Sequence, residues 1–254
     1  FYKSLISIIN AFDNRLEIRG RDSFGISLQF HLKNNEKSKH LNQIIKDDAD
    51  KSCFIEENIG NEFLTTFIFK TANRIGSLGD NANDLRGQIS KSIIMKKIVV
   101  DGNYISVSIV GHTRWASVGD VNIPNCHPID NSGVKQKIDY PLVLSSLNGD
   151  IYNYRELIQS KKNNLDYNFN NIYTTDCQAI SVSLTDIEFE SSDFYNTINT
   201  FQGSYAIAVQ ASSKFGGIYL LKNGEQGLYL GISDDNIMFA SDVYGLVEFC
   251  KYFI

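Results

Sequence analysis

The hydrophobic positions along the chain follow two periods in turn, and each period predicts a kind of element. Between Ser4 and Phe12, apolar residues recur at helical spacing, which predicts a first helix with one buried face. Residues 24–32 alternate between apolar and polar side chains, as strands do, and residues 63–70 form a second β-prone run. The first part of the chain is therefore expected to pack a helix onto strands.

The rest of the chain continues this mixture. Residues 104–110 alternate as a strand, whereas residues 141–147 are almost all apolar, which favours a strand buried on both faces. Further helices are expected at 75–78 and 85–95 with Asp80 or Asn83 as a start cap, at 151–158, after Thr174 and Thr175, at 194–201 and at 242–250. Closing strands are expected at 205–210, 217–221, 227–232 and 237–240. Together these elements predict an α+β layered domain.

One segment interrupts the pattern. Residues 33–61 crowd Lys, Asn, Asp and Glu without a regular period, which predicts a solvated excursion, and we treat them as an insertion. No internal repeat and no convincing linker divides the chain. Residues 1–254 are therefore expected to form a single domain.

Composition narrows the partners and the compartment. The 254 residues carry a net charge of -5 and no basic cluster beyond short Lys pairs, which argues against nucleic acid or an anionic membrane as partner. The four cysteines, at positions 53, 126, 177 and 250, lack metal-ligand spacing and favour reduced thiols in a cytoplasmic protein. No apolar run reaches the roughly 18 to 20 residues of a spanning helix, and the first residues are too polar for a signal peptide. We expect neither a metal nor a cofactor.

A segment framed by glycines, residues 111–119, follows the strand at 104–110 and places Arg114 beside Trp115, the only tryptophan of the chain. An Arg and a ring in a loop that leaves a buried strand can bind a carboxylate through paired donors and seal the space beside it. The same residues are also typical of an Arg paired with a surface acid above a core tryptophan. Both interpretations stay open on this segment alone.

Further short blocks follow one another along nearly the whole chain. They are Arg-Gly-Arg-Asp-Ser at 19–23, Gly-His-Thr-Arg-Trp-Ala-Ser-Val-Gly at 111–119, Asn-Cys-His-Pro at 125–128, Asn-Gly-Asp-Ile-Tyr-Asn at 148–153, Thr-Asp-Cys-Gln at 175–178, Gly-Ser-Tyr-Ala at 203–206 and Phe-Ala-Ser-Asp at 239–242. In this order the blocks resemble class II glutamine amidotransferases, the N-terminal-nucleophile glutaminases. They look most like the glutaminase halves of glucosamine-6-phosphate synthases. The resemblance implies a four-layer αββα sandwich of two antiparallel sheets.

The resemblance also implies a binding site for L-glutamine. Arg114, helped by the hydroxyl of Ser117, would bind the α-carboxylate, and Asp176 would bind the α-ammonium. Trp115 would lie against the exit of the ammonia. Asp176 is also typical of an acid in the first turn of a helix, where the helix dipole favours a negative charge.

Hydrolysis of an amide needs donors for the developing oxyanion. The side-chain amide of Asn148 and the backbone N–H of Gly149 can converge on one oxygen, because glycine lets the backbone come close. Asn-Gly is also the commonest hairpin turn. We favour the donors at 148–149, whose flanks do not both alternate, and accept the hairpin for Asn223-Gly224, which joins two strand-like runs.

Three further residues of the blocks are expected to support the site. A lone His before Pro is usually a structural imidazole, and this is favoured for His127 over direct chemistry. Arg19 and Asp22 are expected to form a salt bridge that closes their turn and so to shape the wall of the pocket.

The nucleophile of this family is an N-terminal cysteine whose own α-amine, with a pKa near 8, accepts the thiol proton. This sequence begins with Phe1, and none of its cysteines is terminal. We therefore expect a chain that is truncated at both ends, with the nucleophile outside it. Loss of catalysis is the alternative.

Three positions depart from the sugar branch, which usually has His, His and Glu where this chain has Val118, Leu147 and Gln178. The expected function is a glutaminase domain that passes ammonia to a synthase domain of the same polypeptide, with fructose 6-phosphate as the acceptor. The alternatives are the purine branch, in which Arg-Tyr is expected instead of Arg114-Trp115, and a glutamine-binding regulatory module without the nucleophile. Homo-oligomerisation stays open.

Overall fold

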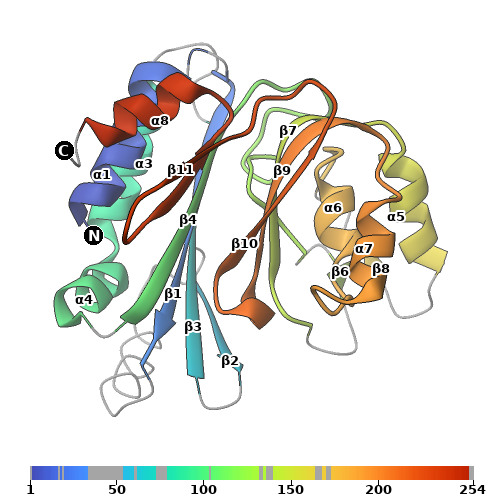
Figure 1. Cartoon of the computed structure of the whole chain (residues 1–254), viewed down its shortest axis with the longest axis horizontal. Helices are drawn as coiled ribbons and strands as arrows, with labels where there is room; N and C mark the ends of the chain where they lie inside the picture. Colours follow the sequence, from blue (N-terminus) through green and yellow to red (C-terminus); the bar gives the residue numbers. More distant parts are fainter. Residues whose placement is uncertain are drawn as a thin grey trace.

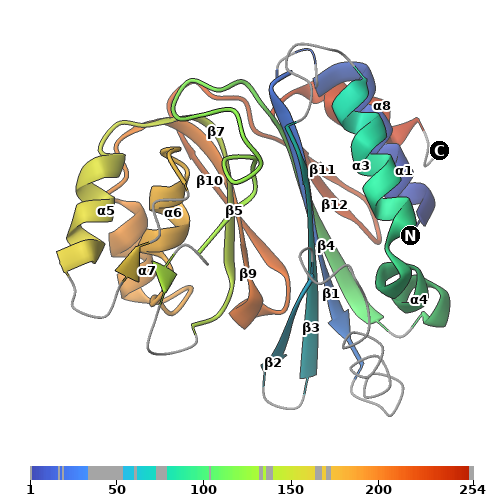
Figure 2. The same ribbon diagram turned by 180° about the vertical axis from the view of Figure 1, so that it is seen from behind.

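Two four-stranded antiparallel sheets face each other, and each carries helices on its outer side (Figure 1). The computed structural model describes residues 2–16, 18, 20–33, 54–59, 62–72, 79–102, 104–131, 134–135, 140–163, 168–169 and 173–251. The layers follow one another as helices, sheet, sheet and helices, as the view from behind also shows (Figure 2). The α+β class and the αββα sandwich expected from the sequence are therefore confirmed.

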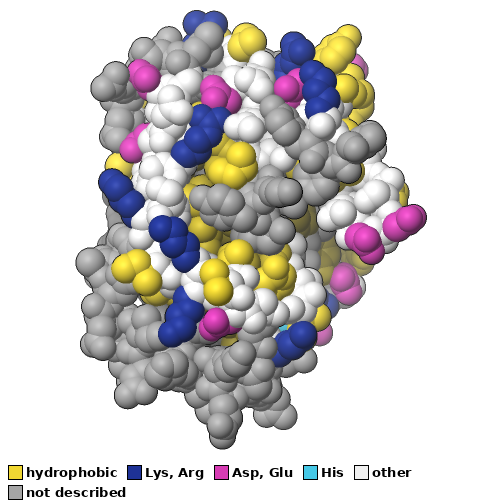
Figure 3. Space-filling model, turned by 90° about the vertical axis from the view of Figure 1, so that its left-hand side faces the viewer, with side chains coloured by type: hydrophobic (Ala, Val, Ile, Leu, Met, Phe, Trp, Pro, Cys, Tyr) yellow, Lys and Arg dark blue, Asp and Glu magenta, His cyan; other side chains and the backbone are white. Residues whose placement is uncertain are grey.

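The first sheet has the order β2-β3-β1-β4. Its strands are β1 (Ser23–Leu32), β2 (Phe54–Ile59), β3 (Glu62–Thr71) and β4 (Tyr104–Arg114). Its outer helices are α1 (Tyr2–Ala11), which continues into the π-helical turn η1 (Phe12–Leu16), α3 (Asp80–Lys91), α4 (Ile93–Asp101) and α8 (Val243–Cys250). On the outer face of these helices, apolar and basic side chains are interspersed (Figure 3).

The second sheet has the order β10-β9-β7-β5. Its strands are β5 (Ile129–Asp130), β7 (Val143–Ile151), β9 (Gly203–Ala211) and β10 (Gly217–Asn223), and its outer helices are α5 (Tyr154–Asn163), α6 (Gln178–Ser183) and α7 (Ser192–Ile198). The short turn η4 (Ser212–Lys214) joins β9 to β10. Two further pairs are β6 (Val134–Lys135) with β8 (Asn168–Phe169), and β11 (Tyr229–Ile232) with β12 (Ile237–Ala240).

Strand alternation directs the apolar side chains outwards, toward the helices. On β1, the residues Phe24, Ile26, Leu28, Phe30 and Leu32 join one buried cluster with α1, α3 and α4. On β7 and β9, the apolar residues of one face join a separate cluster with α6 and α7; they are Val143, Leu147, Ile151, Tyr205, Ile207, Val209 and Ala211. Each sheet therefore has its own hydrophobic core on its helical side.

The facing sides of the two sheets are polar where they meet. The hydroxyl of Ser27 on β1 donates to the side chain of Gln210 on β9. Gln210 in turn donates to the hydroxyl of Ser108 on β4, at 2.9 Å. Buried side-chain groups of this kind stabilise a fold only when they are paired, so these bonds define how the sheets are registered against each other.

Most predicted elements are found near their expected positions, and the differences have local causes. Residues 54–59 form the edge strand β2 paired with β3, so the predicted excursion is wrong there. Residues 34–53 and 60–61 of the predicted excursion lie outside the described residues, and so does the helix predicted at 75–78. The helix predicted at 85–95 is divided, because Ser92 accepts the N–H of Met95 and caps α4. The start cap of α3 is Gly79, not Asp80 or Asn83.

The two Asn-Gly dipeptides also differ from the simple expectation. Asn148 and Gly149 lie inside β7, opposite Ala206 and Tyr205 of β9, and not in a hairpin turn. Asn223 ends β10, but β10 pairs with β9 and β11 pairs with β12, so the hairpin predicted at 223–224 is wrong.

Candidate active site

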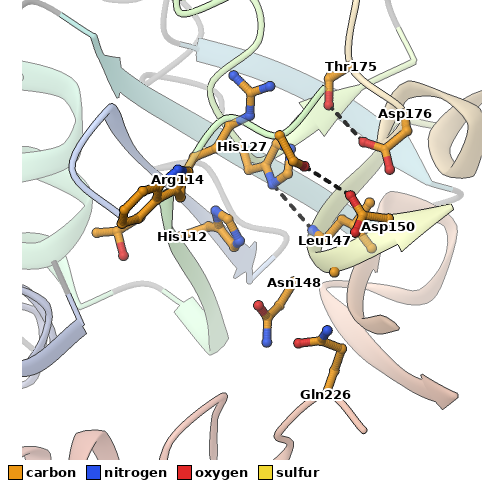
Figure 4. Close-up of a pocket in the computed structure, with 13 residues that line it drawn as sticks. His112, Arg114, His127, Leu147, Asn148, Asp150, Thr175, Asp176 and Gln226 are labelled. Atoms are coloured by element: carbon orange, nitrogen blue, oxygen red, sulfur yellow. Dashed lines mark hydrogen bonds between the residues drawn. The ribbon is translucent and has the colours of Figure 1, made fainter. Parts of the chain in front are cut away.

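A cavity of about 210 Å³ opens between the two sheets, at the ends of β4 and β7. The residues that line it are His112, Thr113, Arg114, Trp115, Ser117, His127, Leu147, Asn148, Gly149, Asp150, Thr175, Asp176 and Gln226 (Figure 4). Every residue expected to bind or activate the substrate is in this set. The fold thus brings together residues from five stretches of the chain, at 112–117, 127, 147–150, 175–176 and 226.

Arg114 is buried at the end of β4, with only 4% of its surface exposed. Its guanidinium donates to the carbonyl oxygens of Val118 and, at 3.1 Å, of Asp120, so it holds the loop that follows it. Burial lowers the pKa of Arg114, while the nearby Asp176 and Asp22 raise it. Among the described residues, Arg114 forms no ion pair with a surface acid.

Trp115 lies at the rim of the cavity and is 71% exposed. It is therefore not a core tryptophan, and its role beside the pocket stays a prediction. Its neighbour Ser117 donates a hydrogen bond of 2.9 Å to Asp150, which belongs to β7. This bond joins the loop after β4 to the opposite sheet across the mouth of the cavity.

The turn at residues 20–22 holds the loop after β4 through two hydrogen bonds. The carboxylate of Asp22 accepts the N–H of Ala116 at 2.8 Å, and the N–H of Asp22 donates to the carbonyl of Arg114 at 3.0 Å. A Cβ at Gly20 would lie 2.4 Å from the carbonyl oxygen of Thr113, so only glycine permits this approach. Arg19, the expected partner of Asp22, lies outside the described residues.

Asp176 lies in the turn just before α6 and is almost fully buried. One carboxylate oxygen accepts the N–H of Ile151 at 2.8 Å, and the other accepts the N–H of Cys177 at 3.0 Å. Burial raises the pKa of this carboxyl, and the neighbouring carboxylate of Asp150 raises it further. The backbone donors that orient Asp176 lower the pKa and so favour the charged form.

Gly149 has a backbone conformation that other residues avoid. Its φ is +107°, and a Cβ there would lie 2.1 Å from the carbonyl oxygen of Ser204 on β9. The side chain of the preceding Asn148 extends into the cavity (Figure 4). Among the described residues, the Asn148 carboxamide has no hydrogen-bond partner. It is therefore available to a ligand.

A pair of imidazoles, His127 buried and His112 half-buried, lines one side of the cavity. The rings of His112 and His127 are 4.4 Å apart, and Nδ1 of His127 accepts the N–H of Leu147 at 3.3 Å. Burial and the charge of Arg114 lower the pKa of His112 to about 4, and burial holds the pKa of His127 well below its usual value. Both rings are therefore neutral near pH 7. The contact with Leu147 suits the supporting role expected of His127.

The cysteines with described positions lie away from this chemistry. Cys126 and Cys177 are fully buried and do not line the cavity. Burial raises the pKa of both thiols, that of Cys177 to about 12. Cys250 is on α8, and Cys53 is outside the described residues. Hence no cysteine with a described position offers a thiolate to this pocket.

The described residues contain no group of three or more His, Cys, Asp or Glu side chains able to hold a metal ion. No helix among the described residues is long and apolar enough to span a membrane.

The sequence did not single out His112, Asp150 or Gln226, which also line the cavity. His112 and Asp150 lie within the quoted blocks, so their neighbours were a signal for them. Gln226 lies in the connection between β10 and β11, and no feature of the sequence pointed to it.

Comparisons with known proteins agree with this geometry. Residues 136–248 match the family model of a glutamine amidotransferase domain. The glutamine--fructose-6-phosphate aminotransferase of Bacillus anthracis is 26% identical over 216 residues, which are 80% of this chain and 34% of that protein. The corresponding enzyme of Sulfolobus acidocaldarius is 30% identical over 186 residues, which are 70% of this chain and 29% of that protein.

A solved structure supports the fold. The glutamine phosphoribosylpyrophosphate amidotransferase of B. subtilis superposes with a TM-score of 0.57 at 14% identity, and the match covers 96% of this chain and 41% of that one. Fold and comparisons together define a glutamine amidotransferase domain, the family to which this chain belongs. Within that family, it is similar to glutamine--fructose-6-phosphate aminotransferases, and it spans about a third of their length.

Proposed function

We propose that the protein binds L-glutamine in this cavity and hydrolyses it to glutamate and ammonia. The observation that carries the proposal is that a guanidinium (Arg114), a carboxylate (Asp176) and a free carboxamide (Asn148) line one cavity of about 210 Å³. Free glutamine has three polar ends, a carboxylate, an ammonium and an amide. Each of these ends has a chemical complement in the cavity.

The two charged ends of glutamine are bound on the Arg114 side. The guanidinium has N–H donors beyond those used for Val118 and Asp120, and these would bind the α-carboxylate. Asp176, already oriented by backbone donors, would bind the α-ammonium, with Asp150 as a second carboxylate nearby. Ser117 would close the rim beside this pair, where its hydroxyl already contacts Asp150.

The amide end of glutamine is the reacting group. In the proposal, a cysteine thiolate attacks the amide carbon, and the developing oxyanion accepts hydrogen bonds from the Asn148 side chain and the Gly149 N–H. Ammonia leaves, and water then hydrolyses the thioester to glutamate. In the proposal, the nucleophile is the N-terminal cysteine that the family resemblance implies, since none of the cysteines with a described position (Cys126, Cys177 and Cys250) lines the cavity.

We further propose that the ammonia passes to a synthase domain of the same polypeptide, where it aminates fructose 6-phosphate to glucosamine 6-phosphate. The support is the similarity to glutamine--fructose-6-phosphate aminotransferases, which are about three times as long as the aligned region. Trp115 beside Arg114 also favours this branch over the purine branch.

A second candidate is a module that binds glutamine without hydrolysing it. The position of the described thiols favours it, since those at 126 and 177 are buried away from the pocket. Glutamate release by the full-length protein separates the two candidates. Turnover that a thiol alkylator abolishes supports hydrolysis, and glutamine binding without turnover supports the module.

Arg114→Ala tests the binding site itself. Truncating a buried partner of a charge pair typically costs about 2–5 kcal/mol of binding free energy, so calorimetry should show a large loss of glutamine affinity. Arg155→Ala is the matched control, because Arg155 lies exposed on α5 beside Tyr154. Unchanged affinity of Arg114→Ala, in a variant that melts like the wild type, contradicts the proposed site.

A further inference from the structure

The connection between β10 and β11 brings one side chain into the cavity, that of Gln226. We propose that Gln226 hydrogen-bonds the side-chain amide of the substrate and so helps the pocket to recognise a carboxamide. This inference rests on the proposed glutamine site and extends it to a residue outside every sequence block described above.

Gln226 lies directly against the oxyanion donors. Its Cγ is 3.0 Å from the point that a Cβ on Gly149 would occupy, so the aliphatic part of Gln226 covers Gly149. Beyond this contact, its carboxamide extends into the cavity near that of Asn148 (Figure 4). Glycine at 149 is thus required both by its own backbone and by the side chain packed over it.

The position of Gln226 is set by backbone contacts of the connection. The side chain of Asn223 donates to the carbonyl of Gly203 at 2.7 Å, and a Cβ on Gly224 would lie 2.7 Å from the hydroxyl of Ser204. At the other end, a Cβ on Gly227 would lie 2.2 Å from the carbonyl oxygen of Ser241. Close packing therefore holds both sides of Gln226 before any ligand arrives.

The carboxamide of Gln226 is not used by the protein itself. Within the described residues, it has no hydrogen-bond partner, as is also true of Asn148. Both side chains are half-buried at the edge of the cavity. Two unengaged carboxamides side by side provide donors and an acceptor for a ligand group of the same kind.

The chemistry of the substrate determines the role of each carboxamide. The amide oxygen of glutamine takes the donors of Asn148 and Gly149, and its NH2 group then needs an acceptor. The side-chain oxygen of Gln226 is a neutral acceptor at this end, whereas Asp150 and Asp176 lie at the ammonium end. The methyl group of L-norvaline offers neither an N–H nor an oxygen at this position, so a ligand of that kind makes no hydrogen bond with Gln226.

The experiment compares two ligands on the full-length protein by calorimetry. L-glutamine carries the carboxamide, and L-norvaline has a methyl group in its place. Gln226→Ala and the nearly isosteric Gln226→Met should each weaken glutamine binding roughly two- to twelvefold, the worth of one neutral hydrogen bond, and leave norvaline affinity unchanged. Gln159→Ala is the control, because Gln159 is exposed on α5.

The outcomes separate this inference from the proposed function. Failure of the wild type to bind glutamine overturns the proposed function and this inference with it. Wild-type binding of glutamine, with both Gln226 variants binding it equally well, overturns the role of Gln226 alone. An equal loss for glutamine and norvaline also overturns it, since that result indicates a distorted pocket and not a lost contact.

Discussion

Gly25 lies against the backbone of His127 behind the site, and its substitution gives a sharp test of the fold. Gly25 lies in β1, opposite Lys70 of β3 and His112 of β4. A Cβ there would lie 2.0 Å from the carbonyl oxygen of His127 and 3.1 Å from its carbonyl carbon. Gly25→Ala must therefore displace His127 by about 1 Å or more, or separate the sheets, because a carbon and an oxygen pack at about 3.5 Å.

The expected loss of stability follows from two opposing terms. Inserting a methyl group into a packed interior typically costs about 1–3 kcal/mol. The replacement of Gly by Ala gives back about 0.4–1 kcal/mol through the unfolded chain. The net expectation is a loss of about 1–2 kcal/mol. Glutamine affinity should fall as well, since His127 accepts the N–H of Leu147, the residue before Asn148.

Gly87 provides the matched control. It lies within α3, and a Cβ there would meet nothing within 4 Å. Gly87→Ala should stabilise the protein by up to about 1 kcal/mol, because alanine is the better helix former. Urea denaturation followed by circular dichroism measures both variants. A Gly25→Ala protein as stable as Gly87→Ala would refute the close approach of β1 to His127.

Three further predictions concern the surroundings of the site. The pKa of His112 is about 4 in the folded protein and near 6.5 in the unfolded chain. The unfolded chain therefore binds protons first, and stability is lost as the pH falls from about 6.5 to 4. His112→Gln should remove about 2–3 kcal/mol of this loss in denaturation curves taken at several pH values, and an unchanged pH profile would contradict the burial of the ring. The side chain of Asn125 is buried, donates to Thr174 and Asp120, and accepts the N–H of Thr174. Asn125→Ala should therefore lower the free energy of unfolding by about 2–3 kcal/mol in urea denaturation. A loss below about 0.5 kcal/mol would show that other contacts hold the loop around Asp120. Iodoacetamide at pH 7.5 should label Cys250 and spare Cys177, because the thiol of Cys177 is buried and its pKa is raised to about 12. Peptide mass spectrometry of the native protein measures the labelling of each cysteine. Equal labelling of the two would rule out the burial of Cys177.

The periodicity of the sequence determined most of the individual elements. The alternation at 24–32 and the helical spacing at 4–12 are local patterns, and β1 and α1 lie within one or two residues of them. Burial follows from the same patterns, because the apolar face of a strand or helix must be covered whatever covers it. The blocks around Arg114 and Asn148 likewise pointed to one cavity, and the structure has them lining one.

Only the tertiary structure decided how segments distant in the chain meet. The dipeptide Asn-Gly occurs twice, with two different outcomes. Residues 148–149 lie inside β7, because β9 pairs with β7 along all of that strand. Residues 223–224 lie at the end of β10, from which the chain continues to a different sheet. Trp115 is exposed although it follows a strand, and Gln226 enters the cavity because β9 and Ser241 hold its loop. Strand pairing, exposure and the lining of a cavity depend on steric contacts and hydrogen bonds with residues far away in the sequence. The local periodicity of hydrophobic residues therefore cannot predict them.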